Sequence, residues 1–254
     1  PPLRPATEAF LDAAVKANKG KPLPGDVVIT TVQLKDIKDP AKKKEREDLI
    51  KEAEGSIADA QYNTGFWYEG VGQFDKAIAA YNRYIARFGD KKDVPDIAYN
   101  IGLVLEKQNK TQEAINQFGS VLTTYAKDAR VTDTRRLELK YRQYLLNTKL
   151  KNQAEVDRLG KDIIASYPKL KPDDQKNDRA MLAFANARFV ALEPTWKAYT
   201  DMKFKKIGTF KTDLPLKQKK LAELEAAYTD VLKSGNHEFG IAALTRIGLL
   251  YGDF

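Results

Sequence analysis

Apolar residues along the chain follow the 3.6-residue period of amphipathic helices, and short polar or glycine-containing turns interrupt them. Two neighbouring stretches carry the same pattern thirty-seven residues apart. In that register Gly65, Tyr68, Ala77, Tyr81, Tyr84 and Phe88 correspond to Gly102, Leu105, Ala114, Phe118, Val121 and Tyr125. Within each stretch Gly72-Gln73-Phe74 and Asn109-Lys110-Thr111 predict turns between two helical periods. Each stretch is therefore predicted to be a pair of antiparallel helices.

The repeated residue types explain how such a pair packs. A glycine in the first helix, Gly65 or Gly102, lets a neighbouring helix approach closely, and Ala77 or Ala114 occupies the close crossing on the second helix. One hairpin cannot bury both of its apolar faces alone, whereas a stack of hairpins can. The pattern thus predicts an array of stacked helix pairs.

Weaker copies of the pattern extend the array toward the C-terminus. The third pair combines a helix at about Thr134–Asn147 with a stripe formed by Val156, Gly160, Ile163 and Tyr167. Helices at 180–192 and 216–233 predict a fourth pair split by an insertion, and Leu244, Ile247, Gly248 and Tyr251 repeat the first-helix pattern of Ala98, Ile101, Gly102 and Leu105. Asn236 is the expected N-cap of that last helix, and a second helix is expected to follow it. The predicted units are about 58–94, 95–131, 134–170, 177–235 with the insertion 194–215, and a partial unit 240–254.

Residues 1–57 are less regular and form a separate N-terminal segment. Thr7–Asn18 predicts a short helix, and the β-branched run Val27–Leu34 predicts either an extended strand or an ordered strap. Ala41–Ile57 predicts a charged helix that packs on the first repeat through one apolar side. That side carries Leu49, Ile50, Ala53 and Ile57.

The repeated segments resemble the tetratricopeptide repeat family. Gln73–Tyr81 is similar to the second-helix signature of that family and Asn100–Leu105 to the first, and the resemblance covers about 58–254. It implies an all-α fold, a right-handed α-solenoid of stacked antiparallel helix pairs whose concave face, lined by first helices, holds a peptide or helix of another protein. The units are longer than the usual 34 residues. Long-period units of this kind resemble bacterial proteins of the cell envelope and of gliding machinery, which implies a periplasmic or envelope location.

Composition removes most catalytic chemistries. The chain has no Cys and one His, so it lacks a thiol nucleophile, a Cys-ligated metal and a histidine-rich metal site. Its carboxylates form no isolated pair in an apolar setting. We therefore expect no enzyme activity, no cofactor and no bound metal. No run of apolar residues is long enough to span a bilayer.

Carrying the family's concave positions onto this chain gives ten candidate partner-binding residues. They are Tyr62, Asn63, Phe66, Glu69, Tyr99, Asn100, Leu103, Glu106, Tyr141 and Arg142. Aromatic side chains offer contact area at low entropic cost, and Asn pairs with both polar groups of an extended backbone. The alternative is that Tyr62, Phe66 and Tyr99 pack between adjacent first helices.

Some members of the family hold a C-terminal carboxylate with Lys, Asn and Arg residues. Asn100 and Arg142 match two of those positions, but Tyr62, Phe66 and Glu138 occupy the others. A carboxylate facing Glu138 would be repelled. A carboxylate clamp of this kind is therefore not expected.

The insertion mixes aromatic and cationic residues in a way that favours two interpretations. Its candidate binding residues are Trp196, Tyr199, Lys203, Phe204, Lys205, Lys206 and Phe210. Such a segment can dock on an acidic protein surface, nucleic acid or anionic lipid, or it can fold back as a flap over the apolar edge of the solenoid.

The charge balance points in the same direction without selecting a partner. The chain carries 43 Lys and Arg against 35 Asp and Glu, a net charge of 43 − 35 = +8, with a basic cluster over Arg130–Lys151. The leading hypothesis is a scaffold that binds a protein or peptide partner, with an acidic partner surface favoured over nucleic acid. The alternative hypothesis is a binder of polyanions, either nucleic acid or an anionic lipid surface, that acts through the insertion.

Overall fold

A computed structural model of the protein describes residues 38–203 and 210–254. Over these ranges the chain forms helices and turns and no strand. It divides into two compact units, Pro1–Lys91 and Lys92–Phe254. The helix expected at Thr7–Asn18 and the extended run Val27–Leu34 lie outside the described residues, as do residues 204–209 of the insertion.

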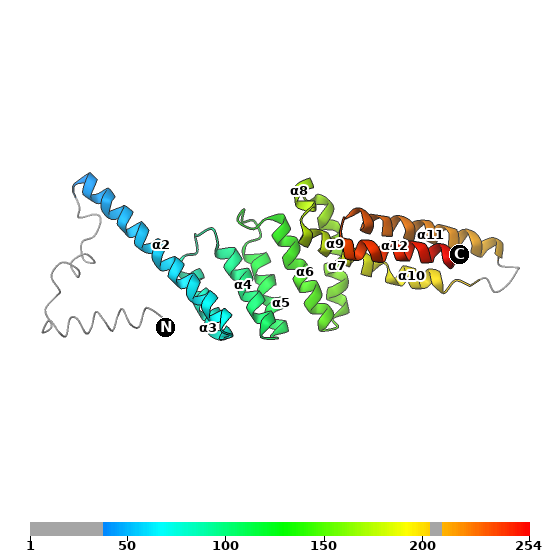
Figure 1. Cartoon of the computed structure of the whole chain (residues 1–254), viewed down its shortest axis with the longest axis horizontal. Helices are drawn as coiled ribbons and strands as arrows, with labels where there is room; N and C mark the ends of the chain where they lie inside the picture. Colours follow the sequence, from blue (N-terminus) through cyan, green and yellow to red (C-terminus); the bar gives the residue numbers. More distant parts are fainter. Residues whose placement is uncertain (1–37, 204–209) are drawn as a thin grey trace. The chain divides into compact units, whose positions relative to one another are not determined.

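Consecutive helices pair along the chain, as Figure 1 shows. In the first unit the pair is α2 (Pro40–Gly70) and α3 (Phe74–Arg87). The second unit contains α4 (Val94–Lys107), α5 (Thr111–Thr124), α6 (Asp133–Lys149), α7 (Gln153–Ser166), the 3-10 turn η3 (Tyr167–Lys169), α8 (Pro172–Gln175), α9 (Asp178–Ala191), α10 (Glu193–Thr200), α11 (Phe210–Lys233) and α12 (His237–Gly252). The predicted all-α architecture of stacked helix pairs is confirmed.

Helix α2 differs from the sequence prediction because it is one continuous helix. Asp39 caps it, its Oδ1 accepting from the Ala41 amide at 2.9 Å. The helix predicted at Ala41–Ile57 continues to Gly70 because no proline or other helix breaker interrupts the segment. The expected packing of the helix 41–57 on the first repeat is also corrected. Leu49 is 52% exposed, because only the second half of α2 carries fully buried residues.

The turns between paired helices share one backbone geometry. Gly72, Asn109 and Lys151 occupy equivalent positions with φ of 73°, 59° and 57°. In each turn the next amide donates to a carbonyl five residues earlier, at 2.8, 3.0 and 2.9 Å respectively. This left-handed residue ends the first helix and lets the chain reverse. The spacing of the three positions fixes the repeat register at thirty-seven and then forty-two residues.

An aromatic ring on a glycine forms the seam between the two helices of each of the first two pairs. The Tyr81 ring of α3 lies so close to Gly65 of α2 that a Cβ there would overlap it, and the Phe118 ring of α5 covers Gly102 of α4 in the same way. Tyr81 is 1% and Phe118 0% exposed. The two glycines predicted at the close approach therefore leave the space that these rings occupy.

The third pair uses the same seam with the two residue types exchanged. In the forty-two-residue register, Tyr144 of α6 replaces Gly102 and Gly160 of α7 replaces Phe118. A Cβ at Gly160 would lie 3.4 Å from the Tyr144 ring, which is an ordinary contact. The combined volume of the two side chains that meet at the seam is therefore nearly the same, although the ring now comes from the first helix. Close packing of protein interiors requires this volume to be conserved.

The C-terminal helices complete the second unit. Asn177 caps α9, its side chain accepting from the Arg179 and Ala180 amides at 3.0 and 3.3 Å, and Asn236 caps α12 as predicted, accepting from the Phe239 amide at 3.0 Å. Helices α9, α10, α11 and α12 share one apolar core. The fourth pair therefore consists of α9 and α11, with α10 packed beside them.

We predict that Gly102→Leu destabilises the protein by about 1–3 kcal/mol or more, since the new side chain must displace the Phe118 ring from a closely packed seam. The matched control is Gly248→Leu on α12, where a Cβ would have no described atom within 4 Å. Because leucine is also the better helix former, that control is expected to be neutral or slightly stabilising. Urea unfolding followed by circular dichroism measures both. Equal stability of the two variants would show that the seam is not closely packed.

Candidate functional site

In the first unit the four predicted partner-binding residues divide into two packed and two exposed side chains. The Tyr62 ring lies 6.3 Å from that of Tyr81, and Glu69 accepts a hydrogen bond from the Tyr81 hydroxyl at 3.0 Å. Burial together with this hydrogen bond raises the pKa of Tyr81. Asn63 and Phe66 are exposed. Of the four residues, these two therefore present free surface.

Trp67 is an exposed aromatic residue that the sequence reasoning missed. It is 69% exposed, and its ring meets that of Phe66, which is 58% exposed, edge-on at 6.5 Å. The residue at the equivalent position of the next repeat, Val104, is 0% exposed. The repeat pattern did not indicate that Trp67 is exposed, because the same position of the next repeat is buried. Together with Val71, which is 65% exposed, these rings form what we call the α2 aromatic patch.

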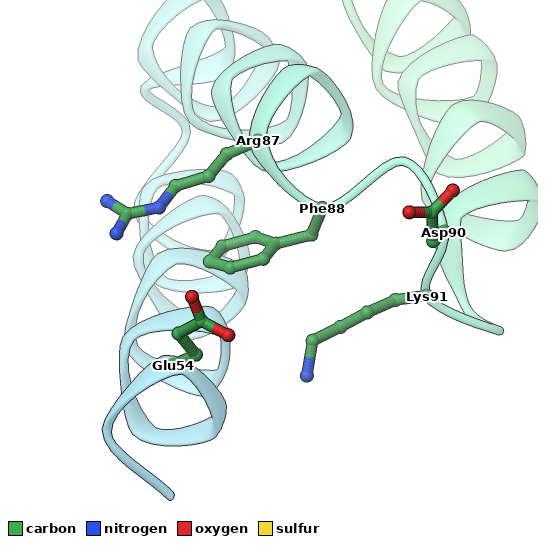
Figure 2. A pocket seen from close by; sticks show the side chains of 5 residues that line it. All are labelled: Glu54, Arg87, Phe88, Asp90 and Lys91. Carbon is green, nitrogen blue, oxygen red and sulfur yellow. The ribbon is translucent and has the colours of Figure 1, made fainter. Parts of the chain in front are cut away.

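A shallow hollow lies between α2 and the loop after α3 (Figure 2). It is lined by Glu54, Arg87, Phe88, Asp90 and Lys91. The Phe88 ring extends toward α2, with the Arg87 guanidinium 5.3 Å and the Lys91 ammonium 5.7 Å from its centroid. Two acids and two bases surround one ring, so the hollow favours no single ligand charge.

In the second unit the predicted aromatic residues are buried. Tyr99 of α4 is 4% exposed and Tyr141 of α6 is 8% exposed, whereas Asn100 and Leu103 are half-buried. The Tyr99 ring lies 5.6 Å from that of Phe118. Burial, reinforced by a hydrogen bond to Glu138, raises the pKa of the Tyr99 hydroxyl. For Tyr99 these contacts match the packing interpretation, whereas the exposed Phe66 does not.

Glu138 joins three first helices. Its carboxylate accepts from the Tyr99 hydroxyl of α4 at 2.6 Å, from Arg135 of α6 at 2.6 Å and from Arg179 of α9 at 2.7 Å. The Arg135 guanidinium also pairs with Asp96 at 3.0 Å and lies 4.3 Å from the Tyr99 ring. Glu138 is 7% exposed, and a buried carboxylate is tolerated because charged donors surround it. We call Asp96, Tyr99, Arg135, Glu138 and Arg179 the Glu138 network.

Two further links connect the same helices. Arg142 pairs with Glu106 of α4 at 3.1 Å, and the Tyr141 hydroxyl accepts from Asn186 of α9 at 2.7 Å. Burial raises the pKa of Glu106, although the charge of Arg142 acts in the opposite direction. The predicted site residues Tyr99, Glu106, Tyr141 and Arg142 are thus brought together by α4, α6 and α9. Their main role in the structure is to tie first helices to one another.

The aromatic residues of the insertion that belong to α10 pack into the core. Tyr199 is 0% exposed, and its hydroxyl donates to the Leu250 carbonyl of α12 at 2.6 Å. The Trp196 ring lies 6.2 Å from that of Tyr228, with the Arg246 guanidinium 4.3 Å from its centroid. For these two residues the flap interpretation agrees with the contacts.

The cations next to α10 are tied to the end of α12. Lys203 pairs with Asp253 at 2.7 Å, and Lys217, which is 2% exposed, donates to the Asp253 carbonyl at 2.6 Å and to the Met202 carbonyl at 3.2 Å. Phe210 is 44% exposed. The candidates Phe204, Lys205 and Lys206 lie outside the described residues. Sequence reasoning missed Lys217, whose signal is a lysine on the apolar face of α11, one helical turn before Leu221.

The basic cluster around α6 forms contacts within the chain. Arg130 pairs with Asp128 at 2.7 Å, Arg136 donates to two backbone carbonyls at 2.9 Å, and Lys140 pairs with Asp162 at 3.0 Å. The contacts of Arg130 and Arg136 help to position the loop before α6, and the Lys140 pair links α6 to α7. The cluster is therefore less free for an external anion than its composition indicates.

Among residues 38–203 and 210–254, no helix combines the length and apolar character needed to cross a membrane. The same residues contain no group of three His, Cys, Asp or Glu side chains placed to hold a metal ion.

The shared turn, the repeated seam and the linked first helices define a repeat protein built from helical hairpins. Residues 59–90 and 96–128 each match the model of the tetratricopeptide repeat family. These two segments are therefore tetratricopeptide repeats, and the third and fourth helix pairs continue the architecture of stacked hairpins beyond them. A comparison with curated proteins found no match. Repeats of this family are typically non-enzymatic and mediate contacts between proteins.

We predict that Glu138→Ala lowers the free energy of unfolding by about 2–3 kcal/mol, because the buried Tyr99 hydroxyl and the Arg179 guanidinium lose this acceptor and Arg135 keeps only Asp96. Asp96→Ala is the matched control, since it removes the other acceptor of Arg135. The Asp96 side chain is 60% exposed, so its loss should cost at most about 0.5 kcal/mol. Urea unfolding compares the two variants, and an equal loss in both would contradict the role assigned to Glu138.

Proposed function

We propose that the protein is a non-enzymatic scaffold that binds a protein partner through the surface of its first helices. The single observation that carries this proposal is the α2 aromatic patch, in which Phe66 and Trp67 expose most of their rings side by side. Exposed, adjacent aromatic side chains are typical of the residues that contribute most to protein–protein binding. The resemblance to envelope proteins adds a bacterial envelope assembly as the setting of this proposal.

The contacts between first helices support rigid presentation of the surface in the second unit. The Glu138 network and the Glu106–Arg142 pair hold α4, α6 and α9 together. The side chains in these contacts are already ordered before a partner binds. A surface that is already ordered loses little conformational entropy when a partner binds. Arg142 and Arg179 keep 37% and 63% of their side chains exposed, so they remain accessible to an acidic group of the partner.

The alternative function, binding of polyanions through the insertion, has less support from the described contacts. Tyr199 is buried, Trp196 packs in the core of the second unit, and Lys203 is paired with Asp253. Stacking on bases or insertion among lipid headgroups requires free aromatic faces. The contacts of α10 therefore favour a structural flap, and the protein scaffold is the function that we propose.

Affinity capture from an extract of the cells that produce the protein tests this proposal. We predict that the parent chain retains a specific protein both at about 0.1 M and at about 0.5 M salt, because apolar contacts are little screened. The double variant Phe66→Ser/Trp67→Ser should reduce the amount retained by at least about tenfold. Quantitative mass spectrometry of the retained proteins measures this.

The control is Leu244→Ser/Tyr251→Ser on α12, which removes exposed apolar surface from the second unit and should retain the partner. Retention of the same protein by the α2 variant would contradict the proposal. Retention of nucleic acid alone, lost between the two salt concentrations, would instead support the polyanion alternative.

A further inference from the structure

Helix α12 presents an apolar face that is largely exposed, although the Tyr251 side chain at its end hydrogen-bonds to Glu225 of α11. Ile241, Leu244 and Tyr251 are 68%, 53% and 56% exposed. Gly248 lies between the last two, and a Cβ there would have no described atom within 4 Å. The spacing of three, four and three residues places all four on one side of the helix. We call these four residues the open face of α12. Contiguous exposed apolar side chains of this kind mark an interaction surface.

The opposite side of α12 is packed in the same way as that of a complete first helix. In the register that aligns Gly248 with Gly102, the residues Gly240, Ala243 and Leu250 correspond to Val94, Ile97 and Val104 of α4. All six are buried. Helix α11 lies along α12, as Figure 1 shows within the second unit. The two first helices therefore share this packed side.

They differ on the side that receives the second helix of the pair. Leu244, Gly248 and Tyr251 align with Ala98, Gly102 and Leu105, which are all buried. On α4 that side is covered by α5, with the Phe118 ring seated on Gly102, and on α2 the Tyr81 ring of α3 is seated on Gly65. The chain thus shows twice what covers a face with this pattern: a helix that places an aromatic ring on the glycine.

We propose that the open face of α12 is the seat of a further second helix that continues the repeat array, with an aromatic side chain packed on Gly248. The pattern of that helix follows from the two complete examples, Ala77 with Tyr81 and Ala114 with Phe118: a small residue followed four positions later by an aromatic one. This inference concerns a different surface from the α2 aromatic patch, so it does not depend on the proposed function.

An extension of the full chain tests the inference with a helix of known sequence. Phe254 corresponds to Gln108, so a copy of residues 109–126 is added directly after Phe254 to supply the turn and the second helix. We expect the extension to raise the melting temperature by at least about 4 °C. It should also slow amide hydrogen exchange in α12 by at least about tenfold, because local opening must then break the new seam.

Two variants of the extended chain test the contact on Gly248. Replacing the copied Phe118 by Ala removes the ring, and Gly248→Leu blocks its seat. Each is expected to remove at least half of the gain in melting temperature and in exchange protection. Gly248→Leu in the parent chain serves as the control and should leave the melting temperature unchanged or slightly higher, since no described atom lies near that position.

Three results would overturn the inference. The first is an extension that changes neither melting temperature nor exchange. The second is a gain that both variants retain, since the ring would then not be seated on Gly248. The third is a parent chain that light scattering shows to be a dimer and that Gly248→Leu converts to a monomer, since a second copy would then be the occupant. None of these results would alter the outcome of the capture experiment on Phe66 and Trp67.

Discussion

The structure depends on one contact, an aromatic ring packed against a glycine between the two helices of a hairpin. Phe118 on Gly102 shows it most directly, because a Cβ at that glycine would overlap the ring. The close approach sets the distance between the helices, and the left-handed residue of the turn sets their direction. In the third pair Tyr144 and Gly160 exchange the two residue types. What the fold requires is therefore a complementary volume across the seam, and either helix can supply the ring.

The polar contacts follow from this geometry. Each seam fixes its hairpin, and the side chains of Glu138 and Arg142 then bridge the first helices of successive pairs. Lys217 does the same between α10, α11 and the end of α12. Such buried charges contribute to stability only with their partners in place. They favour one arrangement of the helices and leave the surface of the first helices ordered before any partner arrives.

The sequence predicted the parts of the structure that depend on local periodicity. The helix pairs, the turns at Gly72 and Asn109, the buried Ala77 and Ala114 and the cap at Asn236 are all confirmed. Periodicity shows which face of a helix is apolar but not what covers it, and this explains the errors. The burial of Tyr199 decides between the two interpretations of its segment, a binding loop and a flap, in favour of the flap. Helix α2 continues through residue 57 because nothing in the segment stops a helix. The exposure of Trp67 was equally invisible, since its repeat position is buried in the next pair.

The seam itself can be tested by transplanting the exchange found in the third pair into the second. A double-mutant cycle compares the free energies of unfolding of Gly102→Tyr, Phe118→Gly and the double variant. If complementary volume is what the seam requires, each single variant loses stability through overlap or a cavity, and the double variant recovers at least about 1 kcal/mol of the summed loss. If the two losses simply add, the ring and the glycine are not coupled and the account of the fold given above is wrong.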